Sequence, residues 1–238
     1  MKLLAIDCST ERLSLALADG DQRWTHEGAG GAQASAALIP AIMGLLDEAQ
    51  LSLKELDAIA FGRGPGAFTG LRTACAVAQG LALGANLRVL PIDTLLVLAH
   101  AAHSSNPQSS RVLSVLDARM GQVYAAAYED GPDGWRCLQA PSLSQPEALV
   151  LPEEWQGQGF VLASNAHATY QEAFASTLSQ GGVAIEAWPQ AVALLTVAAQ
   201  AYARGESVSP AEALPMYVRD KVALTSAERS SANVSRSA

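Results

Sequence analysis

The sequence predicts a duplicated α/β architecture with mixed sheets. An apolar strand that ends in aspartate occurs twice, at residues 3–7 and 112–117, and each copy is followed by a turn and two further strand patterns. In each half, helix and strand patterns then alternate, which is typical of a sheet with helices packed on it. Both observations indicate two lobes built on one plan.

The first half contains five strand patterns and two helix patterns. Residues 13–18 have the period-two character of a strand, and a turn at Gly20 leads into the third strand. A long apolar run then predicts a helix, in which Pro40 would introduce a kink or mark the first turn. Thr69 is placed to cap the second helix. The expected strands are 3–7, 13–18, 23–26, 58–61 and 88–92, and the expected helices are 32–49 and 69–83.

The second half repeats this order. A turn cluster of Asp, Gly and Pro at residues 130–134 separates its second and third strands. Glycines at 181–182 and at Gly205 are placed to end the two helices. The expected strands are 112–116, 122–128, 135–138, 160–163 and 183–185, and the expected helices are 169–178 and 190–204.

A polar stretch at residues 103–110 is the natural boundary between the lobes. We therefore expect an N-terminal lobe at 1–105 and a C-terminal lobe at 106–224. Residues 225–238 are rich in Ser, Ala and Arg without an apolar period, which predicts a flexible tail.

Composition excludes several classes of protein. The 238 residues include 15 Lys and Arg against 23 Asp and Glu, a formal charge of −8, which argues against an autonomous nucleic-acid binder. Three scattered cysteines without a Cys-x-x-Cys pair indicate neither a disulfide framework nor a structural zinc site. The N-terminal apolar run is too short for a signal peptide, and no apolar run is long enough for a membrane span, so a cytoplasmic location is expected.

The glycine-rich segment 61–72 joins a strand to a helix. In one interpretation its backbone N–H groups cradle a phosphate at the helix N-terminus, with Gly64 and Gly66 closest to the anion. In the other it packs tightly against a neighbouring subunit. No Gly-Lys-Ser/Thr follows and the glycine spacing is not a dinucleotide fingerprint, so both interpretations stay open.

The two first-half helices carry almost no charge. Residues 32–46 have none, and the helix at 69–83 has only Arg72. A helix that is apolar all round is buried on all sides, and we favour a contact between chains over a purely internal core. The expected contact residues are Leu38, Ile42, Leu45, Leu46, Leu71, Arg72, Cys75, Ala76, Ala78, Gln79 and Leu83.

Catalytic candidates are few. Asp7 and Asp117 end equivalent strands and, with Ser9, could hold a Mg²⁺–nucleotide in a cleft, although such aspartates also commonly cap turns. His100 and His103 are three residues apart but have no further ligand nearby, so they are expected at the surface of a helix end. Neither a His-Glu-x-x-His motif nor a Gly-x-Ser-x-Gly elbow is present. No metal site is predicted.

Several segments together resemble one known family. Leu4 to Thr10, Gly62 to Arg72 and Gly80 to Ala82 fit it, as do Asp117 to Arg119 with Val123 to Ala126, and Pro215 to Asp220. They resemble the TsaB (YeaZ) family, a subunit of the machinery that makes threonylcarbamoyladenosine at position 37 of tRNA. The resemblance implies a duplicated actin/Hsp70/sugar-kinase-like (RNase H-like) fold.

The resemblance also implies a non-catalytic scaffold and activating subunit. In the related catalytic subunit TsaD, a His-x-x-x-His pair binds the metal; here Thr94 and Leu98 occupy the corresponding positions, and neither replaces imidazole. The implied partners are TsaD, docked on the first-half helices, and the ATPase TsaE, with a homodimer in isolation and tRNA bound only indirectly. No cofactor is implied, except ATP or ADP bound weakly or at the junction with TsaD. One departure is the start of the first helix, residues 33–37, where many relatives are more polar.

Two other functions stay open. One is a weak ATPase or phosphotransferase of the same fold, acting through Asp7, Ser9 and Asp117 with the glycine loop on phosphate. The other is an inactive protease-like or chaperone-like homologue, which no residue of the sequence supports. If the docking interpretation holds, glutamate at Ala76 or Ala78 should abolish TsaD binding without unfolding the chain.

Overall fold

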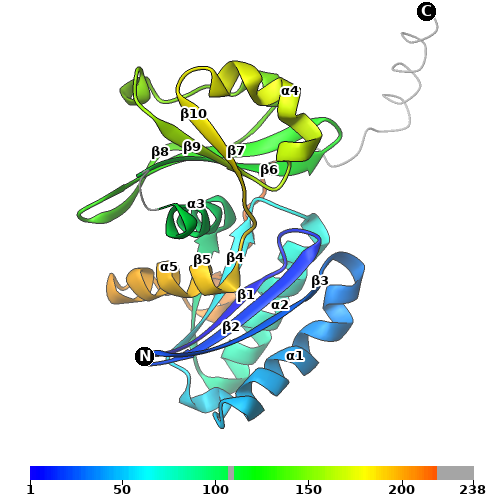
Figure 1. Ribbon diagram of the computed structural model, residues 1–238. Helices are drawn as coiled ribbons and strands as arrows, with labels where there is room; N and C mark the ends of the chain where they lie inside the picture. The colour runs from blue at the N-terminus through cyan, green and yellow to red at the C-terminus, as the bar shows by residue number, and fades with distance from the viewer. Residues whose placement is uncertain (107–109, 219–238) are drawn as a thin grey trace, which may run out of the picture.

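The computed structural model describes residues 1–106 and 110–218 and contains two five-stranded mixed sheets, one above the other in Figure 1. The strand orders, β3-β2-β1-β4-β5 and β8-β7-β6-β9-β10, are the same plan used twice, which confirms the predicted duplication. The first sheet consists of β1 (Lys2–Asp7), β2 (Arg12–Asp19), β3 (Gln22–Ala29), β4 (Ala58–Gly64) and β5 (Arg88–Asp93). The second consists of β6 (Arg111–Arg119), β7 (Gln122–Gly131), β8 (Gly134–Ser144), β9 (Phe160–Ser164) and β10 (Gly182–Glu186).

The described residues form five α-helices that cover these sheets: α1 (Ala34–Glu48), α2 (Phe68–Ala85), α3 (Thr94–Ser105), α4 (His167–Leu178) and α5 (Ala191–Ala203). Helices α1 and α2 pack on one face of the first sheet and α5 on the other. Helix α3 lies between the two sheets, and α4 covers the outer face of the second. In the described part of the chain, none of the helices is both long enough and apolar enough to cross a membrane.

The placement of α5 corrects the expected domain boundaries. Its residues were assigned to a C-terminal lobe at 106–224, but they pack on β1 and β2. The buried Ser14 hydroxyl on β2 accepts a hydrogen bond of 2.8 Å from the backbone N–H of Ala191, the first residue of α5. The first sheet therefore recruits a helix from the far end of the chain to cover its second face. The expected tail, 225–238, and the last two residues of the 215–220 motif lie outside the described residues.

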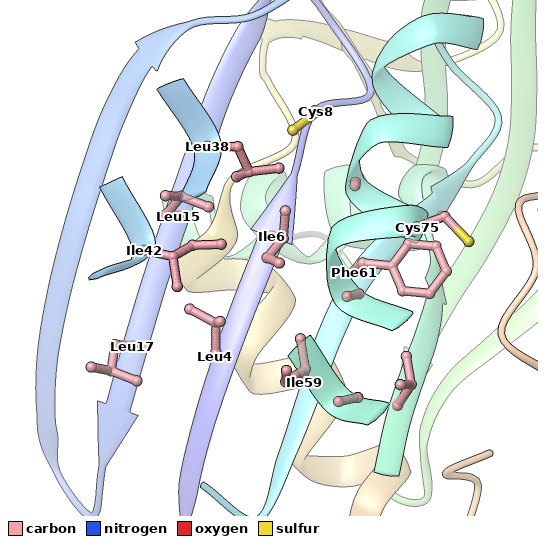
Figure 2. Close-up of a cluster of buried hydrophobic side chains, with 14 of the residues drawn as sticks. Leu4, Ile6, Cys8, Leu15, Leu17, Leu38, Ile42, Ile59, Phe61 and Cys75 are labelled. Carbon is pink, nitrogen blue, oxygen red and sulfur yellow. The ribbon is translucent and has the colours of Figure 1, made fainter. Parts of the chain in front are cut away.

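Successive residues of the central strand face opposite sides of the first sheet. Leu4 and Ile6 on β1 point toward α1 and α2, while Leu3 and Ala5 point toward α5. Figure 2 shows the first of these cores, in which Leu38 and Ile42 of α1 lie over strand residues such as Ile6. Both faces of the sheet are buried, which explains why its central strands are apolar runs rather than alternating ones.

The same packing corrects the expected contact surface. Seven of the expected contact residues are buried within their own chain and are at most 4% exposed: Leu38, Ile42, Leu45, Leu46, Leu71, Cys75 and Ala78. All of them except Leu71 belong to the core that α1 and α2 form with the first sheet. They recur at helical spacing because each helix needs one apolar stripe to pack on the sheet. Arg72, Ala76 and Leu83 are exposed, and Gln79 is half-buried. Both helices thus have an apolar stripe that faces the core, while Ile39, Met43 and Leu83 lie exposed on their outer sides beside small residues such as Ala76 and Gly80.

Candidate functional site: the interlobe cleft and the outer face of the first two helices

A cleft of about 300 Å³ lies where the two lobes meet. The first lobe contributes the β1–β2 turn, the glycine loop and the start of α2, and the second lobe contributes the β6–β7 turn. Residues 216–218 complete the wall. Of the residues that the sequence suggested for binding a nucleotide, Ser9, Gly66 and Asp117 line this cleft. Asp7 and Gly64 do not reach it.

The glycine loop packs against the β1–β2 turn of its own chain. The backbone N–H of Ala67 donates a hydrogen bond of 2.7 Å to the carbonyl of Ser9. A Cβ atom at Gly66 would overlap this Ser9 carbonyl, and one at Gly70 would overlap the carbonyl of Cys8. The geometry thus favours the packing interpretation over the phosphate cradle, with the neighbour inside the same chain rather than in another subunit. Thr69 does not cap α2, because the helix begins one residue earlier and its N-cap is Ala67 without a side-chain cap.

Asp7 is buried beneath the cleft. Its Oδ1 accepts hydrogen bonds from the backbone N–H and the hydroxyl of Ser9, at 2.9 and 2.6 Å. Its Oδ2 has no hydrogen-bond partner and faces the Cα of Gly62, where a Cβ would overlap it. Burial raises the pKa of Asp7 to about 6, against the opposing effect of the Ser9 hydrogen bonds. This carboxyl is enclosed by its own lobe, so the prediction that it faces Asp117 across the cleft is wrong.

Asp117 is engaged by its own lobe. Its Oδ1 accepts hydrogen bonds from the backbone N–H of Arg119 at 2.8 Å and from the Tyr170 hydroxyl at 3.3 Å. Its Oδ2 lies 3.1 Å from the Arg119 guanidinium, which also lies 3.8 Å from Glu11 of the first lobe. A β-bulge between Asp117 and Arg119 directs this arginine across the cleft. The arrangement is an ion-pair bridge between lobes rather than an open pair of carboxylates for Mg²⁺.

Thr94 and Leu98, which the resemblance assigns to the positions of the TsaD histidines, lie at the start of α3. Thr94 and Leu98 are one helical turn apart and fully buried, and the Thr94 hydroxyl accepts a hydrogen bond of 3.1 Å from the N–H of Gly64.

His100 and His103 are partly buried against Trp135, not at an open surface as expected. His100 Nδ1 accepts a hydrogen bond of 3.2 Å from the indole N–H of Trp135. Across residues 1–106 and 110–218, no group of three His, Cys, Asp or Glu side chains could hold a metal ion.

Sequence reasoning missed a cluster at the mouth of the cleft. The guanidinium carbon of Arg72 lies 3.7 Å from the ring centroid of Phe68, and Arg72 Nε donates a hydrogen bond of 2.9 Å to the Tyr217 hydroxyl. The Phe68 and Tyr217 rings are 5.3 Å apart. The only signals in the sequence were the single charge on α2 and the 215–220 motif, and neither indicates that the two segments meet.

Beyond this cluster, the outward-facing sides of α1 and α2 form a surface that we call the α1–α2 face. Its residues are Ile39, Met43, Ala76, Gly80 and Leu83. Leu83 is 76% exposed, and Ile39 and Met43 are about half exposed. None of the five is charged, and large exposed apolar side chains on neighbouring helices are typical of an interaction surface.

Comparison with known proteins agrees with this architecture. The family model "TsaD: tRNA N6-adenosine threonylcarbamoyltransferase" matches residues 27–227. A curated relative from Escherichia coli, "tRNA threonylcarbamoyladenosine biosynthesis protein TsaB", is 34% identical over 94% of this chain and 96% of its own length. The crystal structure of YeaZ from Pseudomonas aeruginosa is 37% identical, with a TM-score of 0.81 over 91% of this chain and 99% of its own. A hexokinase from Thermus thermophilus shares the fold at 15% identity, with a TM-score of 0.51 over 87% of this chain and all of its own.

The two lobes and the cleft between them define a protein of the duplicated actin-like fold, the fold shared with sugar kinases. The match to the TsaD model places the chain within that larger family. The chain belongs to the TsaB family.

Two glycines of α2 test the packing of this helix against the β1–β2 turn. We expect Gly70→Ala to lower the free energy of unfolding by about 1–3 kcal/mol, because its Cβ overlaps the Cys8 carbonyl. Gly80→Ala is the matched control: no atom lies within 4 Å of its Cβ, so it should raise stability by about 0.5–1 kcal/mol through helix propensity. Urea unfolding of both variants checks this. Equal effects would contradict the packing argument.

The buried carboxyl of Asp7 predicts a pH-dependent stability. Its pKa of about 6 in the folded state lies above the unfolded value, so the folded state binds this proton more tightly. The stabilisation is present below about pH 4 and is lost as the pH rises through about 6. Asp7→Asn keeps an acceptor for Ser9 and carries no charge at any pH, so its stability relative to wild type should rise by about 1–3 kcal/mol between pH 4 and pH 8. Parallel stability profiles of the two proteins would exclude this account of the Asp7 environment.

Proposed function

We propose that this chain is a non-catalytic subunit of the machinery that makes N6-threonylcarbamoyladenosine at position 37 of tRNA. In this proposal the α1–α2 face docks on a TsaD-type paralogue and supports its activity. The observation that carries the proposal is the uncharged α1–α2 face, in a chain whose curated relatives are named for this biosynthesis.

The chemistry of the face suits a protein partner of similar fold. Ala76 and Gly80 have small side chains, so another helix can approach the backbone of α2 closely. Ile39, Met43 and Leu83 supply apolar surface area that a partner can bury. Added Cβ atoms at Gly44, Gly80 and Gly84 would meet nothing within 4 Å in this chain. These positions therefore have space that a partner can occupy.

The division of labour follows from the residues at the start of α3. The resemblance assigns Thr94 and Leu98 to the positions of the metal-binding histidines of TsaD, and the proposal therefore assigns transfer of the threonylcarbamoyl group to the paralogue. The ATPase TsaE would engage the assembled pair. With a formal charge of −8, this chain would contact tRNA only indirectly.

The proposal includes no resident cofactor; ATP or ADP would bind weakly or at the junction with the paralogue. In isolation, a second copy of the chain would occupy the same face and form a homodimer. The alternative of an autonomous phosphotransferase has less support, since Asp7 is enclosed by its own lobe and Asp117 is paired with Arg119.

The decisive variant is Ala76→Glu. Ala76 is exposed on α2, so the folded chain should tolerate glutamate, whereas docking would bury an unpaired carboxylate. We expect this variant to lose binding to purified TsaD, measured by calorimetry, and to lose tRNA modification in a mixture of TsaD, TsaE and the adenylate-forming enzyme. Val183→Glu, at an exposed position of the second lobe, is the control and should bind normally.

The sequence suggested Ala78→Glu as an equivalent test of docking, but the structure shows that it does not test docking. Ala78 is fully buried against the first sheet, so that variant would report on folding rather than on docking. If Ala76→Glu, shown to be folded by thermal unfolding, bound TsaD as tightly as wild type, the α1–α2 face would not be the docking surface.

A further inference from the structure

We propose that Arg72 is a preorganised anchor at the end of the α1–α2 face, and that it binds an aspartate or glutamate side chain of the docked partner subunit. This inference rests on the proposed function and deepens it. It assigns a specific polar contact to a surface that is otherwise apolar.

Arg72 is held by residues from two distant segments. Phe68, one turn earlier on α2, supports the flat face of the guanidinium, whose carbon lies 3.7 Å from the ring centroid. Tyr217 accepts a hydrogen bond from Nε at 2.9 Å, and its ring centroid lies 5.7 Å from the same carbon. A stacked and hydrogen-bonded guanidinium has fewer rotamers to lose when a partner binds.

The segment that carries Tyr217 is itself anchored to the first lobe. The backbone N–H of Met216 donates a hydrogen bond of 2.7 Å to the carbonyl of Arg63 in the glycine loop. Further back, the carbonyl of Ala213 accepts hydrogen bonds from Gln79 at 2.9 Å and from the thiol of Cys75 at 3.2 Å. The Tyr217 hydroxyl therefore has a defined position over α2. Its hydrogen bond with Nε in turn holds the Arg72 guanidinium in place.

Within residues 1–106 and 110–218, no side chain or carbonyl engages the terminal nitrogens of Arg72. In the described ranges the guanidinium makes one hydrogen bond, through Nε, and no carboxylate lies within ion-pair distance. By contrast, Arg63 is paired with Asp93 at 2.6 Å and Arg204 with Glu206. A fixed guanidinium with both terminal nitrogens available matches a carboxylate in two-point geometry.

The position of Arg72 favours a protein carboxylate over a phosphate. It lies one turn before Ala76 on the exposed side of α2, continuous with the α1–α2 face. Phe68, Leu71 and Tyr217 line the cleft, but Arg72 does not, so a ligand in the cleft would not meet it. Binding to RNA needs several cations in one patch, and this outer side of α2 has one.

The experiment measures the affinity of purified TsaD for four variants of the full chain by calorimetry. Arg72→Ala should weaken binding on the order of 30-fold or more, as expected for an interface anchor. Arg72→Lys should rescue little of this loss, because a lysine cannot make the two-point contact. Tyr217→Phe, which removes only the hydroxyl, should weaken binding by about 3- to 10-fold. Arg23→Ala, an exposed arginine that bonds carbonyls of its own turn, is the control and should bind normally.

Two further measurements separate anchoring from general effects. If Tyr217 acts by positioning the guanidinium, Tyr217→Phe should cost nothing more in the Arg72→Ala background. Replacing acidic residues of TsaD by their amides should identify one whose loss has no additional effect on Arg72→Ala. Thermal unfolding confirms that every variant is folded.

The possible outcomes are distinguishable. Normal binding by Arg72→Ala together with lost binding by Ala76→Glu would overturn the anchor and leave the proposed function standing. Normal binding by both variants would remove the proposed function as well. If Arg72→Ala kept its affinity for TsaD but lost affinity for tRNA or ADP, Arg72 would be a phosphate contact and the inference would be wrong.

Discussion

Where α2 begins, its backbone lies directly against the turn between β1 and β2. Ser9 accepts a hydrogen bond from Ala67, and the carbonyl of Cys8 fills the space that a side chain at position 70 would need. This approach forms one wall of the interlobe cleft and encloses Asp7 beneath it. It also fixes the rotation of α2, so Ala74 and Ala78 face the sheet while Arg72 and Ala76 face outward.

A second constraint comes from the C-terminal part of the described chain. After α5 covers the free face of the first sheet, Val208 pairs with Val89 at the edge strand β5. The chain then continues past α2 to the mouth of the cleft. Tyr217 therefore reaches Arg72 although 145 residues separate them in sequence. The first lobe is completed by residues that follow the second lobe, which makes the two lobes interdependent.

Much of this architecture could be predicted from the sequence, because the strand patterns and the repeated aspartate-ended strand depend on local periodicity. The orientation of α1 and α2 about their own axes could not be predicted, since apolar residues occur on both sides of each helix: Ala78 is buried, whereas Ala76 and Leu83 are exposed. Large residues such as Leu38 were therefore assigned to a partner although the sheet of their own chain buries them. The sequence also could not predict which of the two sheets α5 covers, because the apolar pattern of a helix does not specify the surface on which it packs. The contact between Arg72 and Tyr217 joins two distant segments of the chain, and no local sequence pattern predicts it.

The small, uncharged residues of the α1–α2 face and the single arginine at its end would act differently on the recognition of a docked partner. A surface of Ala, Gly and a few aliphatic side chains favours close contact but discriminates weakly between registers of an opposing helix. A fixed cation at one end penalises every register that leaves it unpaired, so it adds specificity as well as affinity. Phe68 and Tyr217 hold this cation and also line the cleft. The two side chains that hold Arg72 are therefore also part of the cleft wall, and any partner that engages Arg72 must lie beside the cleft mouth.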